Sequence, residues 1–595
     1  MSTRKKNKHT RLPKLFLMIF TLVLGTSLAF AGPHKLSRDL EGKSPSDQNR
    51  VDVIVQFNQV PTAYHHQKVF DRGGQRGRDL GQFKGGAYSI PASSLADLAA
   101  DPEVVYISPD RPLRRTSNAP TLDYHTDTVN APAAWASGLD GTGIGVAVVD
   151  SGIADLPDLH SSRKFNGSNV VYNRDFTGLG SATDQYGHGT HVSGIIAGTG
   201  ANSRGYSYLY TFQGIAGNAN IINLRVLDQN GAGTDSTVIA AIQTAIQLKS
   251  AYNIRVINLS LGRPVFESYT LDPLCQAVEQ AWKSGIVVVV AAGNYGRSNS
   301  AGTYGYGTIT APGNDPYVIT VGAMNTMGTA DRTDDVIASY SSKGPSYIDQ
   351  VVKPDLVAPG NLVISLYASG ETLLKQAAGN VVSTSLYLRN SNGAPSSSYM
   401  ALSGTSMAAP VVSGAAALML QANPALTPDQ VKARLMLTSF KNLVHASTVT
   451  DSTTGQTFYE QADVFTVGAG LLDIQAALAN TNLAPSTVGS AMSPVARVDA
   501  NGNVTVVAYG SSVLGGNSIL WGNSILWGNS ILWGSSSTVA GNSILWGSSS
   551  PIQGSSILWG NTSLSGSDAV GGSSILWGSS GTEIDASSVL WGSKR

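Results

Sequence analysis

Three polar side chains could together carry out nucleophilic catalysis: an aspartate, a histidine and a serine. Asp150 ends the apolar run VAVVD and meets a glycine-containing turn, and His188 lies in YGHGTHVSG at the start of a stretch of small residues. Ser406 lies in LSGTSMAAPVV, where a Gly-Thr turn enters an apolar helix. The start of a helix presents free N–H groups and the positive end of its dipole. An oxyanion beside the Ser406 hydroxyl would therefore be stabilised.

Each of the three residues also has a structural interpretation when it is taken alone. Asp150 could cap a helix or form a turn, and Ser406 could be an ordinary serine at a helix start. His188 and His191 form an H-x-x-H pair, a spacing that zinc sites use. No third ligand stands at a fixed spacing and no general-base glutamate is adjacent. The sequence therefore favours a site without a catalytic metal.

The segment from about 120 to 480 has the pattern of buried parallel strands separated by helices. Its apolar, β-branched runs lie at 144–149, 221–227, 255–261, 286–292 and 317–321. Such runs suit strands that are covered on both faces. One helix is predicted at 271–284 with Asp272 as its N-cap, and Thr427 opens another in a capping box. The alternation predicts an α/β fold with a doubly wound, mostly parallel sheet.

The N-terminal region has the pattern of a secretory signal followed by a small mixed domain. A basic segment precedes an apolar run at 15–30, which closes with the small-x-small pattern Ala-Phe-Ala. A signal peptide over residues 1–31 is predicted, and an uncleaved anchor is the alternative. No later segment reads as long and apolar enough to span a bilayer. Residues 33–117 then predict a small α+β domain with a ferredoxin-like fold, with strands at 51–57, 86–90 and 104–107.

The motifs DSG, HGTHVSG and GTSMAAP, in this order, resemble those of the subtilisin-like serine proteases, the subtilase family. The chain order Asp, His, Ser is the one known for subtilisin. The resemblance covers residues 122–478. It implies that Ser406 is the nucleophile, that His188 is the general base and that Asp150 orients the imidazolium. Asn294, which ends VVVVAAGN, would donate its side-chain amide to the oxyanion.

The same resemblance implies a site for extended polypeptide substrates. The two backbone segments that would bind the peptide between them are Gly231, Ala232 and Gly233 on one side and Ser260, Leu261 and Gly262 on the other. Because main-chain pairing accepts many sequences, broad specificity is expected. No cofactor is required for the chemistry. Calcium is a candidate structural ion, since Asp158 lies near a family ligand position, although no compact acidic cage accompanies it.

The segment at 33–117 resembles the inhibitory propeptides of subtilases, and a peptidase domain would follow at 118–480. The resemblance implies a self-processed zymogen whose own propeptide acts as an intramolecular inhibitor. We expect self-cleavage between Leu113 and Asn118, in the segment that would lie in the substrate cleft. A permanent peptide-binding domain is the alternative. A signal peptide and a propeptide together predict a secreted enzyme.

The balance of charged residues does not indicate a nucleic-acid partner. Lys and Arg number 39, and Asp and Glu also number 39, so nothing in the balance indicates nucleic acid. Cys275 is the only cysteine, so no intrachain disulfide can form.

Residues 481–595 form a low-complexity region, rich in Ser and Gly, that contains SILWG repeats. The tryptophans of these repeats are Trp521, Trp527, Trp533, Trp546, Trp559, Trp577 and Trp591, at spacings of 6, 6, 13, 13, 18 and 14. Ordered β-strands and a disordered tail are both open interpretations. The region has no histidine, no cysteine and no clustered carboxylates that could carry out hydrolysis. We therefore expect it to serve cell-surface attachment or self-association.

Two functions of different classes follow. The leading hypothesis is a secreted serine endopeptidase. The alternative is a surface or matrix protein whose repeats are primary and whose protease serves to process or release it. An inactive pseudo-protease is disfavoured because the triad and the oxyanion asparagine are all present.

Overall fold

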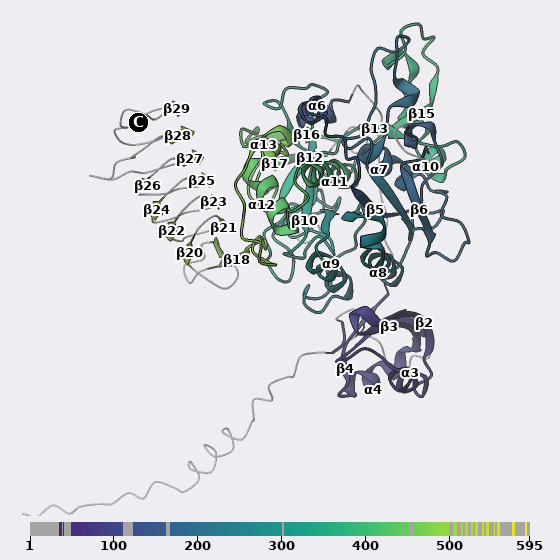
Figure 1. Cartoon of the computed structure of the whole chain (residues 1–595). Coiled ribbons are helices and arrows are strands. Elements are labelled where there is room, and N and C mark those ends of the chain that lie inside the picture. Colours follow the sequence, from purple (N-terminus) through teal and green to yellow (C-terminus); the bar gives the residue numbers. More distant parts are fainter. Residues whose placement is uncertain are drawn as a thin grey trace, which may run out of the picture.

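The computed structural model describes residues 35–37, 40, 49–110, 123–161, 167–299, 303–451 and 456–498, together with short strands beyond 503. Figure 1 shows a small sheet domain at the N-terminal side, a large α/β domain, and a ladder of strands near the C-terminus. The predicted signal peptide and the predicted cleavage bond lie outside the described residues.

The small N-terminal domain is a four-stranded antiparallel sheet with two helices. Its elements are β1 (Arg50–Phe57), α3 (Ala63–Phe70), β2 (Gln75–Leu80), β3 (Gly85–Pro91), α4 (Leu95–Ala100) and β4 (Val104–Pro109). The sheet order is β2-β3-β1-β4, and Val53, Val55 and Phe57 of β1 lie in the core. The sequence pattern missed β2, because this edge strand reads QRGRDL and is mostly exposed.

The large domain is built on an eight-stranded sheet of order β11-β10-β9-β8-β5-β7-β6, with β12 also paired to β10. The strands are β5 (Gly145–Asp150), β6 (Val170–Asp175), β7 (Asn220–Arg225), β8 (Ile254–Leu259), β9 (Val287–Ala291), β10 (Ile319–Asn325), β11 (Val336–Ile337) and β12 (Leu356–Pro359). All pairings are parallel except that of β11 with β10. The predicted α/β sheet is therefore confirmed, with the bounds of four predicted strands within two residues, while β10 ends four residues later than the predicted 321.

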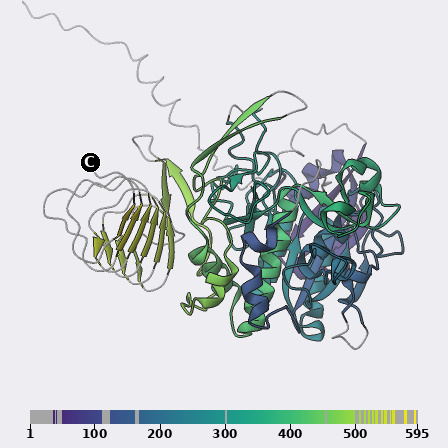
Figure 2. The ribbon, with the colours of Figure 1, turned by 90° about the horizontal axis from the view of Figure 1, so that it is seen from above.

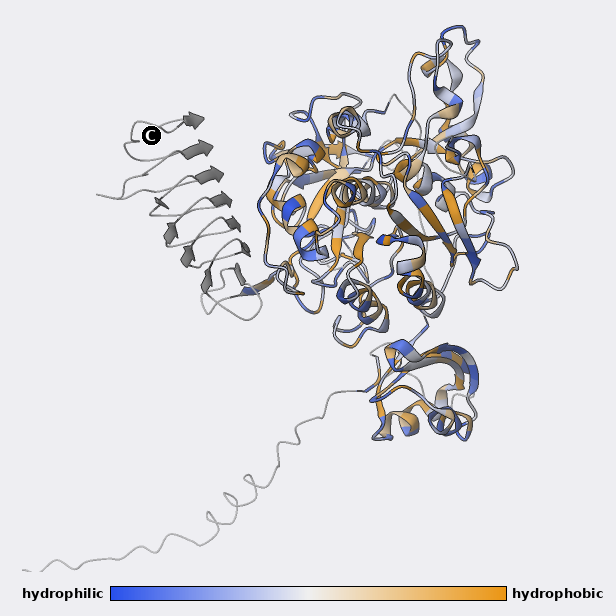
Figure 3. Cartoon of the chain, in the orientation of Figure 1, coloured by the Kyte–Doolittle hydropathy of each residue, from blue (hydrophilic) through white to orange (hydrophobic). Residues whose placement is uncertain are grey.

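Helices cover both faces of this sheet. The longer ones are α7 (His188–Ala197), α8 (Asp235–Tyr252), α9 (Pro273–Lys283), α11 (Thr405–Ala422) and α12 (Pro428–Thr438); α5 (His125–Thr128), α6 (Ala131–Ala136) and α13 (Ile474–Ala479) are short. As predicted, Asp272 caps α9 and Thr427 caps α12. Figure 3 shows the hydrophobic residues gathered in the central strands and in α11.

Helix α11 packs against β8, β9, β10 and α7 in the centre of the domain. Among the described residues, it alone is long and apolar enough to cross a membrane, and 89% of that stretch is buried within the domain. This corrects the expectation that no segment after the N-terminus would reach that length and hydropathy. The helix is apolar on all sides because the sheet and α7 surround it.

An antiparallel insertion follows β12 and reaches back to α7. It contains β13 (Val363–Leu366), α10 (Thr372–Gln376), β14 (Val381–Ser383) and β15 (Pro395–Leu402), with the strand order β13-β15-β14. It projects from the large domain beside α7 in Figure 1. The sequence patterns did not predict this unit. Two further hairpins are formed by β16 (Ala446–Thr450) with β17 (Thr457–Gln461) and by β18 (Val495–Val498) with β19 (Val504–Val507).

The backbone of the repeat region forms two parallel sheets. One sheet contains β20 (Val513–Gly515), β22 (Ile525–Trp527), β24 (Thr538–Ala540) and β26 (Ile552–Gln553). The other contains β21 (Ser518–Trp521), β23 (Ser530–Trp533), β25 (Ser543–Trp546), β27 (Ser556–Trp559), β28 (Ser574–Trp577) and β29 (Val589–Trp591). Figure 2 shows these strands as a ladder beside the large domain.

The strand register accounts for the uneven spacing of the repeats. Trp521, Trp533, Trp546 and Trp559 pair position for position in successive strands of one sheet, whereas Trp527 belongs to the other sheet. Each coil of this solenoid therefore uses 12 or 13 residues in its first turns. The six-residue period near 520 is half a coil, so neighbouring copies fall on alternate sheets.

Candidate active site

Asp150 and His188 meet at the carboxyl edge of the sheet. Asp150 is the last residue of β5, and His188 is the first residue of α7. Asp150 Oδ1 lies 2.5 Å from His188 Nδ1, and the side chains of both residues are 1% exposed. The backbone N–H of Ser151 donates to the same Oδ1 over 2.8 Å. A carboxylate at this point fixes the tautomer and orientation of the imidazole.

The start of α7 is held by Asp184, which the sequence motifs did not single out. Its Oδ1 accepts hydrogen bonds from the N–H groups of Tyr186 and Gly187 and from the hydroxyl of Ser151. Its Oδ2 accepts from the N–H and hydroxyl of Thr190. Burial raises the pKa of this carboxyl. Asp184 thus links the end of β5, which carries Asp150, to the helix that carries His188.

Ser406 is the second residue of α11, where backbone N–H groups have no partner within the helix. Its hydroxyl donates to the carbonyl of Ser260 over 3.0 Å, and the Ser260 hydroxyl donates to the carbonyl of Ser406 over 2.8 Å. Asn258 in turn donates to the Ser260 hydroxyl. The start of α11 is therefore joined to the segment that follows β8.

Asn294 follows β9 and faces the same helix start. Its side-chain oxygen accepts from the N–H of Thr405 over 2.9 Å and from the Thr405 hydroxyl over 3.1 Å. Since an amide has one oxygen and one NH₂ group, these bonds fix the amide and leave the NH₂ group as its donor to a ligand. Asn294 lines the same cleft as His188 and Ser406.

One cleft of roughly 180 Å³ collects most of the predicted site residues. Its lining includes His188, Asn294 and Ser406, and also Gly231, Ser260, Leu261 and Gly262, whereas Asp150 lies behind His188 and is not part of the lining. Ala232 and Gly233 are not part of this lining. The N–H of Ala232 donates to Asp228 Oδ1 and its carbonyl accepts from the Asp228 N–H, while the N–H of Gly231 donates to the Asp228 carbonyl over 3.1 Å. The sequence did not indicate Tyr186, Leu227, Tyr295 and Thr310, which also line the cleft.

His191 lies apart from this cleft. Its Nε2 is 3.1 Å from the carbonyl oxygen of Met400 in β15, and the residue is fully buried. In the described part of the chain, no group of three or more His, Cys, Asp or Glu side chains could hold a metal ion.

Both carboxylate oxygens of Asp158, the calcium candidate, accept hydrogen bonds from protein donors. The N–H of Asn202 donates to its Oδ1 over 2.6 Å, and the hydroxyl of Tyr399 donates to its Oδ2. Burial raises the pKa of this carboxyl, and the hydrogen bonds from Tyr399 and Asn202 act in the opposite direction. Tyr399 comes from the insertion and also bonds to Ser203. Protein donors therefore occupy both oxygens of the candidate ligand.

Comparison with known proteins agrees with this geometry. The subtilase family (Peptidase S8) matches residues 141–470. Serine protease AprX of Bacillus subtilis (strain 168) is 38% identical over 322 residues, which are 52% of this chain and 65% of that protein. Subtilisin E of the same organism is 31% identical over 477 residues, which are 78% of this chain and 99% of that protein.

A solved structure shows the same fold. The crystal structure of fervidolysin from Fervidobacterium pennivorans, a keratinolytic enzyme related to subtilisin, aligns with a TM-score of 0.53 and 22% identity. The alignment covers 79% of this chain and 66% of that one. Fold and sequence together define a serine protease built on a parallel α/β sheet. The chain belongs to the subtilase family.

Proposed function

We propose that this chain is a secreted endopeptidase that hydrolyses peptide bonds through Asp150, His188 and Ser406. The Ser406 oxygen attacks the scissile carbonyl while its proton passes to His188, and His188 then protonates the leaving amine. Water hydrolyses the resulting acyl-enzyme by the same proton path in reverse. The observation that carries this proposal is the 2.5 Å contact between Asp150 and His188 in the cleft that Ser406 also lines.

Two donors would stabilise the oxyanion of the tetrahedral intermediate. One is the N–H of Ser406 in the first turn of α11, and the other is the amide NH₂ of Asn294. Because Thr405 bonds to the oxygen of that amide, the NH₂ group is oriented before substrate arrives. Such preorganised donors contribute about 3 to 4 kcal/mol each to transition-state stabilisation.

The pocket beside Ser406 favours an uncharged side chain. Gly262 and Gly293 both pack against Thr310: a Cβ at Gly262 would lie 2.4 Å from the Thr310 hydroxyl, and one at Gly293 would lie 2.7 Å from its methyl group. Thr310 thus closes a pocket whose lining contains no Asp, Glu, Lys or Arg among the described residues. Since main-chain pairing supplies most of the binding, we expect broad specificity for uncharged residues at this position.

The N-terminal domain is proposed to act as an inhibitory propeptide, because it docks beside the cleft. Asp110, at the end of β4, accepts hydrogen bonds from the N–H of Ser236 over 2.8 Å and from the Ser236 hydroxyl. Ser236 lies in the first turn of α8, shortly after Gly231–Gly233. Arg78 of β2 donates to the carbonyl of Phe176, and Gln56 donates to that of Leu271. Asp110 therefore lies close to the edge of the substrate site.

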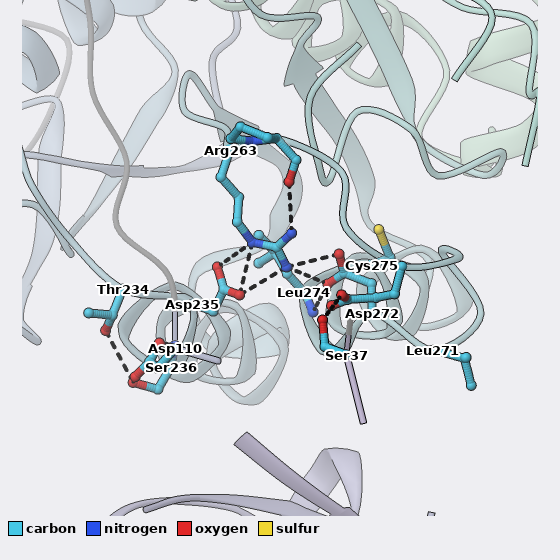
Figure 4. Close-up of polar contacts among 12 residues, drawn as sticks. Ser37, Asp110, Thr234, Asp235, Ser236, Arg263, Leu271, Asp272, Leu274 and Cys275 are labelled. Carbon is cyan, nitrogen blue, oxygen red and sulfur yellow. Dashed lines mark hydrogen bonds and ion pairs between the residues drawn. The ribbon is translucent and has the colours of Figure 1, made fainter. Parts of the chain in front are cut away.

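A buried arginine connects the two helix starts on the surface where the N-terminal domain docks (Figure 4). Arg263 follows Gly262, and its guanidinium bonds to Asp235 at the start of α8 and to Asp272, the N-cap of α9. All three side chains are at most 1% exposed. The arrangement joins both helix starts to the substrate-binding segment, so docking and substrate binding share one rigid support.

The repeat region is proposed to be an accessory module for self-association or surface retention. Its last strand, β29, pairs only with β28 among the described strands, so its other edge could accept a further strand. The test is to compare secreted full-length protein with a chain that ends at 498. Equal peptide hydrolysis with loss of retention or association supports the module, and equal retention contradicts it.

The catalytic proposal is tested on secreted full-length protein. A serine-reactive fluorophosphonate should label Ser406, and Ser406→Ala should lower kcat/KM by at least about 10⁴-fold. N-terminal sequencing should find a mature chain that begins between Leu113 and Asn118. Hydrolysis that survives Ser406→Ala would refute the mechanism, and a secreted chain that begins before Arg111 would refute self-processing.

A further inference from the structure

The loop that leads into His188 is paired with the insertion. The N–H of Thr372 donates to the carbonyl of Gln185 over 3.0 Å, and the N–H of Leu373 donates to that of Tyr186 over 2.8 Å. Both donors lie in the first turn of α10, where backbone N–H groups have no partner within the helix. The insertion therefore fixes the backbone from which the catalytic helix starts.

A buried carboxyl group completes this contact. Glu371, which precedes α10, is 3% exposed. A Cβ at Gly187 would lie 2.7 Å from Glu371 Oε2 and 3.1 Å from its Cδ, so the carboxyl group packs directly on the residue before His188. Gly187 has a φ of 109°, in the left-handed region that favours glycine. The carboxyl group thus covers the residue whose backbone turns the chain into α7.

The insertion also holds Glu371 and α7 at further points. The N–H of Ala368 donates to Glu371 Oε2 over 3.0 Å. The hydroxyl of Ser365 donates to the carbonyl of His191 in α7 over 2.8 Å, and His191 Nε2 lies 3.1 Å from the carbonyl oxygen of Met400. Because the insertion contacts α7 at its start and in its middle, a change at Glu371 acts on a fixed joint.

Two carboxyl groups meet at this joint. Burial, followed by the nearby Asp184 carboxylate, raises the pKa of Glu371 to about 8, while Ala368 and Thr190 act in the opposite direction. The charge of Glu371 in turn acts on Tyr367, which follows β13. Glu371 is therefore neutral below about pH 8. Above that pH, its ionisation would put a second buried negative charge beside Asp184, which is unfavourable.

We propose that Glu371 is a positioning residue for the catalytic histidine: its uncharged carboxyl group holds Gly187 and the start of α7 in the geometry that proton transfer to His188 requires, and its ionisation disturbs that geometry. This inference rests on the proposed endopeptidase function and gives the insertion a role in the control of activity. Glu371 is not among the described residues that line the cleft. The effect should therefore fall on kcat rather than on KM, since a small displacement of a catalytic group slows the chemical step.

The test is the pH dependence of kcat and KM for hydrolysis of a tetrapeptide p-nitroanilide with an uncharged residue before the scissile bond. Wild-type kcat should fall at least about tenfold between about pH 7 and about pH 10, and it should recover when the pH is lowered again. Glu371→Gln carries an amide that stays neutral, so its kcat should remain within about twofold of the wild-type value at about pH 7 and should not fall up to about pH 10. Gln376→Ala, at an exposed side chain of α10, is the matched control and should keep the wild-type profile.

A second variant tests the packing on Gly187 rather than the charge. Glu371→Ala removes the carboxyl group, so kcat should fall about tenfold at about pH 7 while KM stays within about twofold. Titration of the active sites with a fluorophosphonate gives the amount of folded enzyme, and kcat is calculated for that amount. An unchanged kcat in Glu371→Ala would contradict the positioning role.

The remaining outcomes separate the two proposals. A wild-type kcat that does not fall up to about pH 10, or a Glu371→Gln profile as steep as that of the wild type, overturns the positioning role while the protease stands. Absence of hydrolysis by the wild type at every pH contradicts the endopeptidase proposal itself. If Glu371→Gln does not fold, Glu371→Met supplies an uncharged side chain of similar length and should give the same flat profile.

Discussion

Helices α7 and α8 both begin beside a carboxylate, but the two carboxylates come from different parts of the chain. Asp184, at the start of α7, belongs to the large domain and makes five hydrogen bonds there. Asp110, at the start of α8, belongs to the N-terminal domain and bonds only to Ser236 on that helix. The cap of α7 thus comes from its own domain, whereas α8 has a capping box at Thr234 and, in addition, a cap from the N-terminal domain that the proposed self-processing would remove.

Removal of the permanent cap should have the largest effect. Asp184→Ala leaves the donors of Gly187, Thr190 and Ser151 buried without their acceptor, so we expect a loss of about 3 to 5 kcal/mol in the free energy of unfolding. Denaturant titration measures it. Asp331→Ala, at an exposed turn where Asp331 bonds Thr333, is the matched control and should cost less than about 1 kcal/mol. Equal losses in the two variants would show that Asp184 is not a special support.

The segment that follows α7 is also held from within the large domain, because the N–H of Thr199 donates to the backbone carbonyl of Asp158 over 2.7 Å and the N–H of Asn202 donates to its Oδ1. Tyr399→Phe removes the hydroxyl that bonds this carboxylate, and a buried hydrogen bond to such a group contributes about 1.5 to 3 kcal/mol. Thermal unfolding should show the loss, and Tyr347→Phe, at an exposed tyrosine, should not. Because protein donors occupy Asp158, EDTA should change the wild-type Tm by less than about 2 °C. A larger EDTA effect that Asp158→Asn abolishes would place calcium there after all.

The removable cap should show a smaller, pH-dependent effect. In full-length Ser406→Ala protein, Asp110→Ala should weaken docking by about 1 to 2 kcal/mol, because the N–H of Ser236 loses its acceptor. Hydrogen exchange at the start of α8 would rise accordingly. Asp97→Ala, at an exposed carboxylate of the same domain, is the control and should leave the exchange unchanged.

The sign of the pH dependence follows from the pKa of Asp110, which burial raises in the docked state. A carboxyl whose pKa is higher when docked takes up a proton on docking. Docking should therefore be strongest at acidic pH, weaken as pH rises through the docked pKa, and change little above it. Asp110→Asn keeps an oxygen acceptor but cannot ionise, so it should flatten this profile. A variant profile as steep as the wild type would assign the titration to another group.

The smallest effect is expected from loss of the repeat region. A chain that ends at 498 keeps both capped helices, so its kcat/KM should stay within about twofold and its Tm within about 2 °C of the full-length values. Peptide hydrolysis and thermal unfolding of both proteins measure this. A large loss of either would mean that the solenoid supports the peptidase domain directly.

Local signals in the sequence predicted much of the fold. The buried strands, the Asp272 cap and the Thr427 capping box are each encoded within a few neighbouring residues. Strand β2 was missed because an edge strand needs no apolar alternation. The insertion was missed because two of its strands are short and the third has serines near its start. Its aromatic residues, such as Tyr399, pack against Phe212 and Tyr387 only in the folded chain.

Parts of the candidate site could not be read from the chain for a different reason. The motifs located Asp150, His188, Ser406 and Asn294 because each lies in a distinctive local context. The cluster of Arg263 with Asp235 and Asp272, by contrast, joins residues whose proximity exists only after β8 and two helices have packed. In the repeat region, the spacing of the tryptophans was known, but their division between two sheets depends on the path of the coil.

Cys275 gives the molecule a chemical property that would matter for the secreted protein proposed above. This thiol lies fully buried in α9, donates to Asn314, and has a pKa raised well above its usual value by burial. A protonated, enclosed thiol reacts slowly with oxidants and with other thiols. The folded chain could therefore persist in an oxidising medium without intermolecular crosslinks. Modification of Cys275 by a thiol reagent would then mark the moment at which α9 leaves the sheet, so the protein carries its own reporter of unfolding.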